Sequence, residues 1–128
     1  MQTSSQLAER RRDKRYKVPD GGVALVTPPG PHSTIVGDII DVSMNGLSFQ
    51  YLADKAIPAG ATELTIASAR DKSYLRGLPV RAVSDFEIAK VPFSSLSPRR
   101  HGLEFGDLTP EQVAHLEKFI ATHTDQGA

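Results

Sequence analysis

The chain of 128 residues contains no cysteine, which excludes disulfide bonds and metal sites built on thiolates. It also has no apolar run that approaches the roughly 20 residues of a membrane-spanning helix. Residues 1–6 are polar and lack the apolar core of a secretory signal peptide. We therefore expect a protein that stays in the cytoplasm and does not insert into a membrane.

The formal net charge is zero, so the chain as a whole does not have the composition of a basic nucleic-acid binder. The charge is nevertheless uneven, because basic side chains cluster near the N-terminus and only Glu9 and Asp13 oppose them there. Such a local excess can attract a small anion or a polyanion, although a solvated charged arm is the simpler alternative. The basic residues of this segment are Arg10, Arg11, Arg12, Lys14, Arg15 and Lys17.

Short segments rich in apolar and β-branched residues alternate with glycine- and proline-containing turns along most of the chain. This pattern predicts several short strands and favours an antiparallel barrel or sandwich over an α/β sheet. The expected strands cover residues 23–26, 34–42, 47–51, 63–67, 75–83 and 101–105. Residues 70–73 are a polar hairpin connection, and proline and serine within 92–99 predict a longer loop.

A helix is predicted near the C-terminus. Thr109 can cap it, Pro110 suits its first turn, and Gln112 completes a capping-box pattern. The apolar residues Val113, Leu116, Phe119 and Ile120 share one face at helical spacing. We expect a helix over 110–122 that closes one mouth of a barrel, rather than one whose apolar stripe waits for a partner.

Two short motifs are the best candidates for a functional site. In the first, Arg11 and Arg15 frame a five-residue window, and arginine suits bidentate contact with phosphates and guanine edges. In the second, Asp41 and Ser43 precede Gly46 at a turn and offer acceptors and a hydroxyl. Asn45 and Gly46 both tolerate positive φ and predict a tight turn. We expect Gly46 to keep this turn compact, so that Asp41 and Ser43 point outward together. Either motif alone is also compatible with a charged arm or a plain hairpin.

Together, the two motifs resemble those of the PilZ family in order, spacing and following strand. The family carries R-x-x-x-R before its first strand and D/N-x-S-x-x-G before its third. The resemblance implies a mainly β fold, a small six-stranded antiparallel β-barrel with a C-terminal α-helix. The expected organisation is a flexible lead over 1–9, a PilZ-like domain over 10–122 and a tail over 123–128. Within the domain, the arginine arm spans 10–15, the barrel 16–106 and the helix 110–122.

The resemblance implies a non-catalytic receptor for the bacterial second messenger cyclic di-GMP. In the family, the two arginines contact guanine and phosphate, and the aspartate and serine contact a guanine. Arg10 precedes the first motif arginine, and in the family an extra arginine there often accompanies a stacked ligand dimer, which we favour here. The expected ligand residues are Arg10, Arg11, Arg15, Asp41, Ser43 and Gly46, with no metal and no other cofactor. We expect the arm to change conformation on binding and to signal to an unidentified protein effector.

Features of enzymes are missing from the sequence, so we do not expect catalysis. The histidines show no metal-ligand spacing and are expected in surface or core packing, and no G-x-S-x-G or phosphate-binding glycine loop occurs. Two alternatives remain open. The first is a PilZ-like adaptor that acts through protein contacts without nucleotide. The second is a small barrel that binds nucleic acid through the basic arm, which the neutral charge and the shortage of exposed stacking aromatics disfavour.

Overall fold

The alternation of apolar and polar side chains builds a chain of antiparallel strands followed by a helix. The computed structural model describes residues 14–19, 21–28, 34–70 and 72–124. Its elements are β1 (Tyr16–Lys17), β2 (Gly22–Thr27), β3 (Ile35–Val42), β4 (Gly46–Ala53), β5 (Ala61–Ser68), β6 (Tyr74–Glu87), β7 (Ser97–Phe105) and α2 (Pro110–His123).

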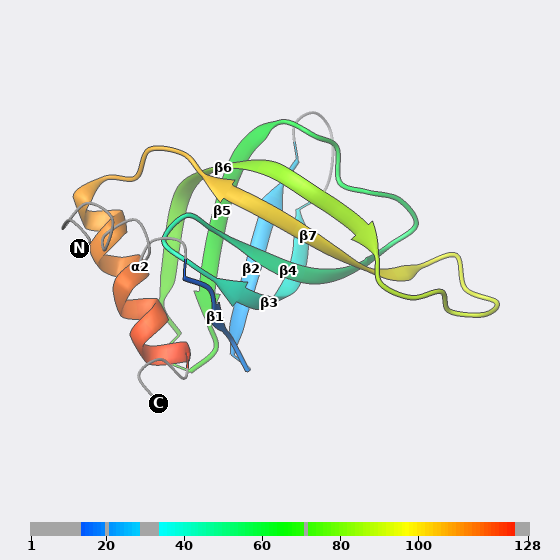
Figure 1. Cartoon of the computed structure of the whole chain (residues 1–128), viewed down its shortest axis with the longest axis horizontal. Helices are drawn as coiled ribbons and strands as arrows, with labels where there is room; N and C mark the ends of the chain where they lie inside the picture. The colour runs from blue at the N-terminus through cyan, green and yellow to red at the C-terminus, as the bar shows by residue number, and fades with distance from the viewer. Residues whose placement is uncertain (1–13, 20, 29–33, 71, 125–128) are drawn as a thin grey trace, which may run out of the picture.

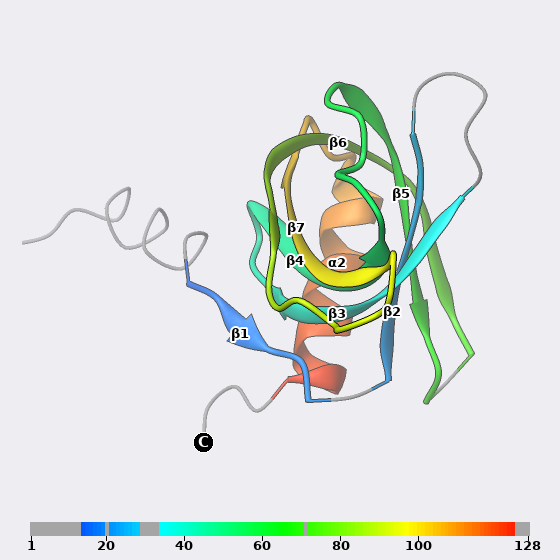
Figure 2. The same cartoon turned by 90° about the vertical axis from the view of Figure 1, so that its right-hand side faces the viewer.

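The strands form one continuous sheet that closes on itself. The order is β1-β3-β2-β5-β6-β7-β4, and an additional pairing of β3 with β4 joins the two sides of the sheet. The ring therefore comprises the six strands β2 to β7, and the short β1 lies beside β3 through the pair Tyr16 and Val42. Figure 2 shows the strands surrounding the barrel interior, with α2 behind it. The predicted six-stranded antiparallel barrel is confirmed.

The core is formed by the inward-facing residues of the strands. On β4, Leu47, Phe49 and Tyr51 are all buried, as their alternation predicts. They join apolar side chains from the other strands and from α2 in one cluster. The interior is thus filled by side chains, so a ligand must bind on the outside of the barrel or at its ends.

Helix α2 covers one end of the barrel, as Figure 1 shows. Its capping box is present, because the hydroxyl of Thr109 accepts from the amide of Gln112 and the Gln112 side chain accepts from the amide of Thr109. Its apolar face, with Leu116, Phe119 and Ile120, is buried in the core cluster, so the predicted closing role is confirmed. The helix ends at His123, one residue beyond the expected end. Among the described residues, no helix is long and apolar enough to cross a membrane.

The connection between β6 and β7 differs from the sequence prediction. A loop was expected over 92–99, but β7 already begins at Ser97. Ser97 pairs with Ala53 of β4, and Arg99 pairs with both Tyr51 of β4 and Glu87 of β6. Hydrogen bonds to strands on both sides therefore override the local composition of proline and serine. In Figure 1 this hairpin extends from the barrel on the side away from α2.

Candidate ligand-binding site around Asp41

The side chain of Asp41 is the centre of a polar cluster on the outside of the barrel. Arg15 donates from Nη1 to Oδ1 of Asp41 at 2.9 Å, and Arg100 donates from Nη2 to Oδ2 at 2.8 Å. The hydroxyl of Ser48 also donates to Oδ1 at 2.8 Å. The Asp41 side chain is 13 % exposed, whereas those of Arg15 and Arg100 are 49 % and 37 % exposed. One carboxylate therefore holds two guanidinium groups at the surface.

The two sequence motifs lie together in space. Arg15 comes from the first motif and Asp41 from the second, and their ion pair joins residues 26 positions apart. The pairing of β1 with β3 brings them together, because Lys17 lies opposite Asp41. Arg10 and Arg11 lie outside the described residues, and their predicted contacts remain predictions.

Ser43 contributes to the turn between β3 and β4 rather than to the outer surface. It is only 1 % exposed, and its hydroxyl oxygen accepts from the amides of Asn45 at 3.0 Å and Gly46 at 3.2 Å. The amide of Ser43 donates to the carbonyl of Gly46 at 2.8 Å. The expectation that Ser43 points outward beside Asp41 is therefore wrong, because its hydroxyl satisfies buried amides of the turn.

Gly46 is required for a different reason from the one expected. Neither Asn45 nor Gly46 has a positive φ. Instead, a Cβ added at Gly46 would collide with the carbonyl oxygen of Leu103 on β7. The glycine thus permits close approach of two backbones at the start of the β4–β7 ladder, where Gly46 lies opposite Glu104.

Arg100 is a member of the cluster that the sequence analysis did not single out. It lies on β7, 59 residues after Asp41, and it also donates to the hydroxyl of Ser48 at 3.1 Å. Only the register of β7 against β4, in which Arg100 lies opposite Gln50, brings it to the site. No local pattern around Arg100 signals this contact.

A buried polar cluster lies on the opposite face of β7. Arg99 donates to Asp85 at 2.7 Å, the Tyr51 hydroxyl donates to Asp85 at 2.5 Å, and Nδ1 of His101 lies 2.7 Å from Asp85. Burial acts to raise the pKa of Asp85, but the hydrogen bonds from Tyr51, Arg99 and His101 outweigh it and lower that pKa. Burial and the bond to Asp85 raise the pKa of Tyr51 to about 12. The cluster anchors β7 from inside, directly behind Arg100.

A hollow of about 360 Å³ opens beside the two motifs. Its lining includes Arg15 and Asn45 from the two motifs, Val83 from β6 and Glu104 from β7. Its volume falls within the range of small-molecule sites. Of the Asp41 cluster, Arg15 lines this hollow.

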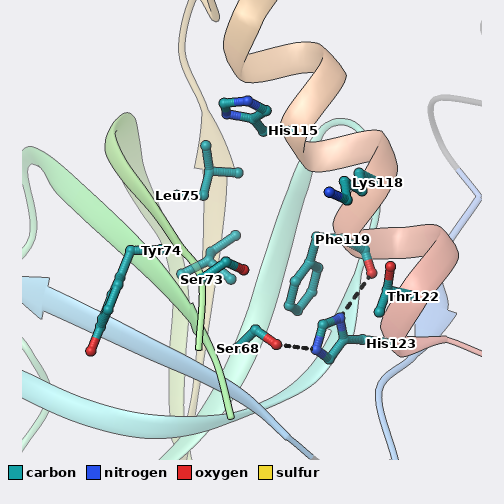
Figure 3. A pocket seen from close by; sticks show the side chains of 10 residues that line it. Ser68, Ser73, Tyr74, Leu75, His115, Lys118, Phe119, Thr122 and His123 are labelled. Carbon is teal, nitrogen blue, oxygen red and sulfur yellow. Dashed lines mark hydrogen bonds between the residues drawn. The ribbon is translucent and has the colours of Figure 1, made fainter. Parts of the chain in front are cut away.

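A second hollow, of about 160 Å³, lies between α2 and the β5–β6 hairpin (Figure 3). At its base, Oγ of Ser68 and Nε2 of His123 lie 2.5 Å apart, and Nδ1 of His123 lies 3.3 Å from the carbonyl of Phe119. Both nitrogens of the buried imidazole have partners, so His123 fastens the end of α2 to the barrel. None of the residues around this hollow belongs to the Asp41 cluster.

Groups suited to a metal ion are not found in the part of the chain that the structure describes. No cluster of three or more histidine, aspartate or glutamate side chains is placed there to hold one. Asp41 and Asp85, the carboxylates of the two polar clusters, have basic or hydroxyl partners instead. The Asp41 cluster thus presents one carboxylate and two guanidinium groups at the surface.

Comparison with known proteins identifies the fold. No protein-family model matches the sequence, and a search of curated proteins finds no match. The structure is similar to the PilZ domain of YcgR from Escherichia coli solved with cyclic di-GMP, with a TM-score of 0.69 and 16 % identity over 89 % of this chain and 91 % of that one. It is also similar to PlzA of Borreliella burgdorferi in complex with cyclic di-GMP, with a TM-score of 0.62 and 18 % identity over 97 % of this chain and 57 % of that one. The chain therefore has the fold of a PilZ domain.

Proposed function

We propose that this protein is a non-catalytic receptor for cyclic di-GMP. The observation that carries the proposal is the contact of Arg15 with Asp41, which unites the two motif residues on the outer face of the barrel. Both fold neighbours were solved with cyclic di-GMP, which supports the same ligand class here. We propose that Arg10, Arg11, Arg15 and Asp41 contact the ligand, and that Ser43 and Gly46 support the site by shaping the turn beside Asp41.

The chemistry of guanine matches the side chains of the cluster. Arginine can donate to O6 and N7 of the base, and a carboxylate can accept from N1 and N2, which are free in an unpaired nucleotide. We infer that guanine replaces Arg15 on Asp41, and that the released guanidinium turns to the ligand. Because the Arg15 side chain is 49 % exposed, breaking its ion pair with Asp41 costs little free energy.

Replacing Arg15 tests whether this side chain recognises guanine specifically or only adds to the positive charge that attracts the ligand. We expect Arg15→Ala to weaken cyclic di-GMP binding by roughly 5- to 150-fold, because a bidentate contact to guanine contributes about 1–3 kcal/mol. Lys14→Ala is the matched control, since the Lys14 ammonium lies 5.1 Å from the ring centroid of Tyr16, whereas Asp41 accepts from Arg15, Ser48 and Arg100. Calorimetric titration of both variants checks this. Equal losses would indicate a general positive field and favour a nucleic-acid ligand instead.

The arm before β1 is the proposed signalling element. Phosphates and guanines would give Arg10, Arg11 and Arg15 fixed partners, and the extra arginine at position 10 favours a stacked pair of ligand molecules. We propose that the resulting change in the arm alters the surface that a protein effector binds, in the cytoplasm.

Hydrogen exchange tests this switch. We expect the amides of residues 8–16 to exchange more slowly with cyclic di-GMP than without it, because contacts with the ligand would order the arm and offset its lost chain entropy. Amides of β5, away from the site, serve as the internal control. Exchange in the arm that is the same with and without saturating ligand would contradict the switch while leaving binding intact.

A further inference from the structure

The register of the outer barrel face places an aromatic ring beside the Asp41 cluster. On β7, Arg100 lies opposite Gln50 of β4 on one side and opposite Phe86 of β6 on the other. Side chains directly opposite one another in an antiparallel pair point to the same face of the sheet. Phe86 therefore shares the outer face with Arg100, whose guanidinium contacts Asp41.

Phe86 is unusual for an aromatic residue because it is 51 % exposed. Its neighbours along β6 confirm its direction, since Asp85 lies opposite His101 and faces the interior cluster with it. A half-exposed aromatic ring is a suitable surface on which a flat heterocycle such as guanine can stack.

The outer face between Asp41 and β6 carries small side chains. In the adjacent cross-strand row, Asp41 lies opposite Ser48, Ser48 opposite Gly102, and Gly102 opposite Ser84. The side chains of this row are short, and the guanidinium of Arg100 lies against Ser48 and Asp41 at its β3 end. The row crosses three strand spacings, which amounts to roughly 14 Å at about 4.8 Å each. One base held at Asp41 would not extend to Phe86, but a ligand with more than one base would.

We propose that Phe86, which lies opposite Arg100 of β7 on the outer face, is a stacking platform for a second guanine base, while Asp41 binds the first. The inference rests on the proposed function and adds a base-binding subsite to it. The second base belongs either to the same cyclic dinucleotide or to a second ligand molecule stacked on the first, and both sources present the same heterocycle to the ring.

The protein contains no tryptophan, so Phe86→Trp introduces a single fluorophore at the proposed platform. Stacked guanine quenches indole fluorescence, and we expect a saturable loss of emission on titration with cyclic di-GMP. Phe93→Trp is the matched control, because Phe93 is fully exposed in the β6–β7 connection and lies outside both strands. Quenching of the Phe86→Trp variant and not of the Phe93→Trp variant supports the platform, and equal behaviour of the two variants overturns it.

Calorimetry of Phe86→Leu separates this inference from the proposed function. We expect an affinity loss of about fivefold or more, the lower limit for removal of a stacked aromatic ring, with Phe93→Leu unchanged. If the unmodified protein binds cyclic di-GMP and Phe86→Leu binds equally well, the platform is overturned and the receptor function stands. If the unmodified protein does not bind cyclic di-GMP, both the receptor function and the platform are overturned. If the fluorescence of Phe86→Trp is fully quenched at one cyclic di-GMP per chain, the base on the platform belongs to the molecule that Asp41 binds. If full quenching requires two cyclic di-GMP per chain, the base belongs to a second molecule.

Discussion

Gly46→Ala is expected to cost about 3 kcal/mol or more of folding free energy, or to prevent folding. The added methyl group would collide with the carbonyl oxygen of Leu103, a backbone atom that cannot rotate away. Relief requires separation of β4 from β7 where their ladder begins, at the pair Gly46 and Glu104. Since a domain of this size is stable by only roughly 5–15 kcal/mol, such a loss is large. Chemical denaturation with an unchanged m-value measures it.

Gly77→Ala is the control that isolates the close approach from backbone strain. Gly77 has a φ of +69°, but nothing lies within 4 Å of the Cβ it would gain. We expect Gly77→Ala to cost about 1–2 kcal/mol, the strain of a left-handed conformation for an L-residue. If Gly46→Ala is as stable as Gly77→Ala, the backbones of β4 and β7 are not as close as described.

Asp41→Asn is expected to reduce cyclic di-GMP affinity by at least about tenfold, since charged hydrogen bonds contribute roughly 1.5–3 kcal/mol each. The amide keeps the size of the side chain but replaces one acceptor oxygen by a donor, which opposes both guanine N–H groups and the guanidinium groups of Arg15 and Arg100. Stability should fall by no more than about 1 kcal/mol, because both arginines are partly exposed.

Asp54→Asn provides the matched control for charge. Asp54 is exposed directly after β4, so the same loss of one negative charge occurs outside the Asp41 cluster. Titration calorimetry and thermal unfolding of both variants check the expectation. An Asp41→Asn variant that binds cyclic di-GMP as tightly as Asp54→Asn would remove Asp41 from the ligand site.

Features with local causes could be predicted from the sequence. The capping box of Thr109 and Gln112 depends on residues three positions apart, and the helix begins where expected. The alternation of Leu47, Phe49 and Tyr51 depends only on the two-residue period of a strand and identified their buried face. Such signals act over a few residues, so they are visible without knowledge of the fold.

Features that depend on register could not be predicted in the same way. Arg100 reaches Asp41, and Phe86 lies beside Arg100, only because β7 pairs with β4 and β6 at one particular offset. A shift of one residue would turn both side chains to the other face. The sequence does not distinguish the two roles of Ser43, because a serine at a turn suits both solvent contact and amide capping, and only its burial shows which it has.

Isothermal titration calorimetry of the unmodified protein with cyclic di-GMP tests the receptor function most directly, with GMP and ATP as controls for charge and for a single base. The proposed function predicts saturable heat with cyclic di-GMP and no comparable binding of either control, with two ligands per chain if the ligand binds as a stacked pair. Flat heats with cyclic di-GMP at protein concentrations where the domain is folded would contradict it.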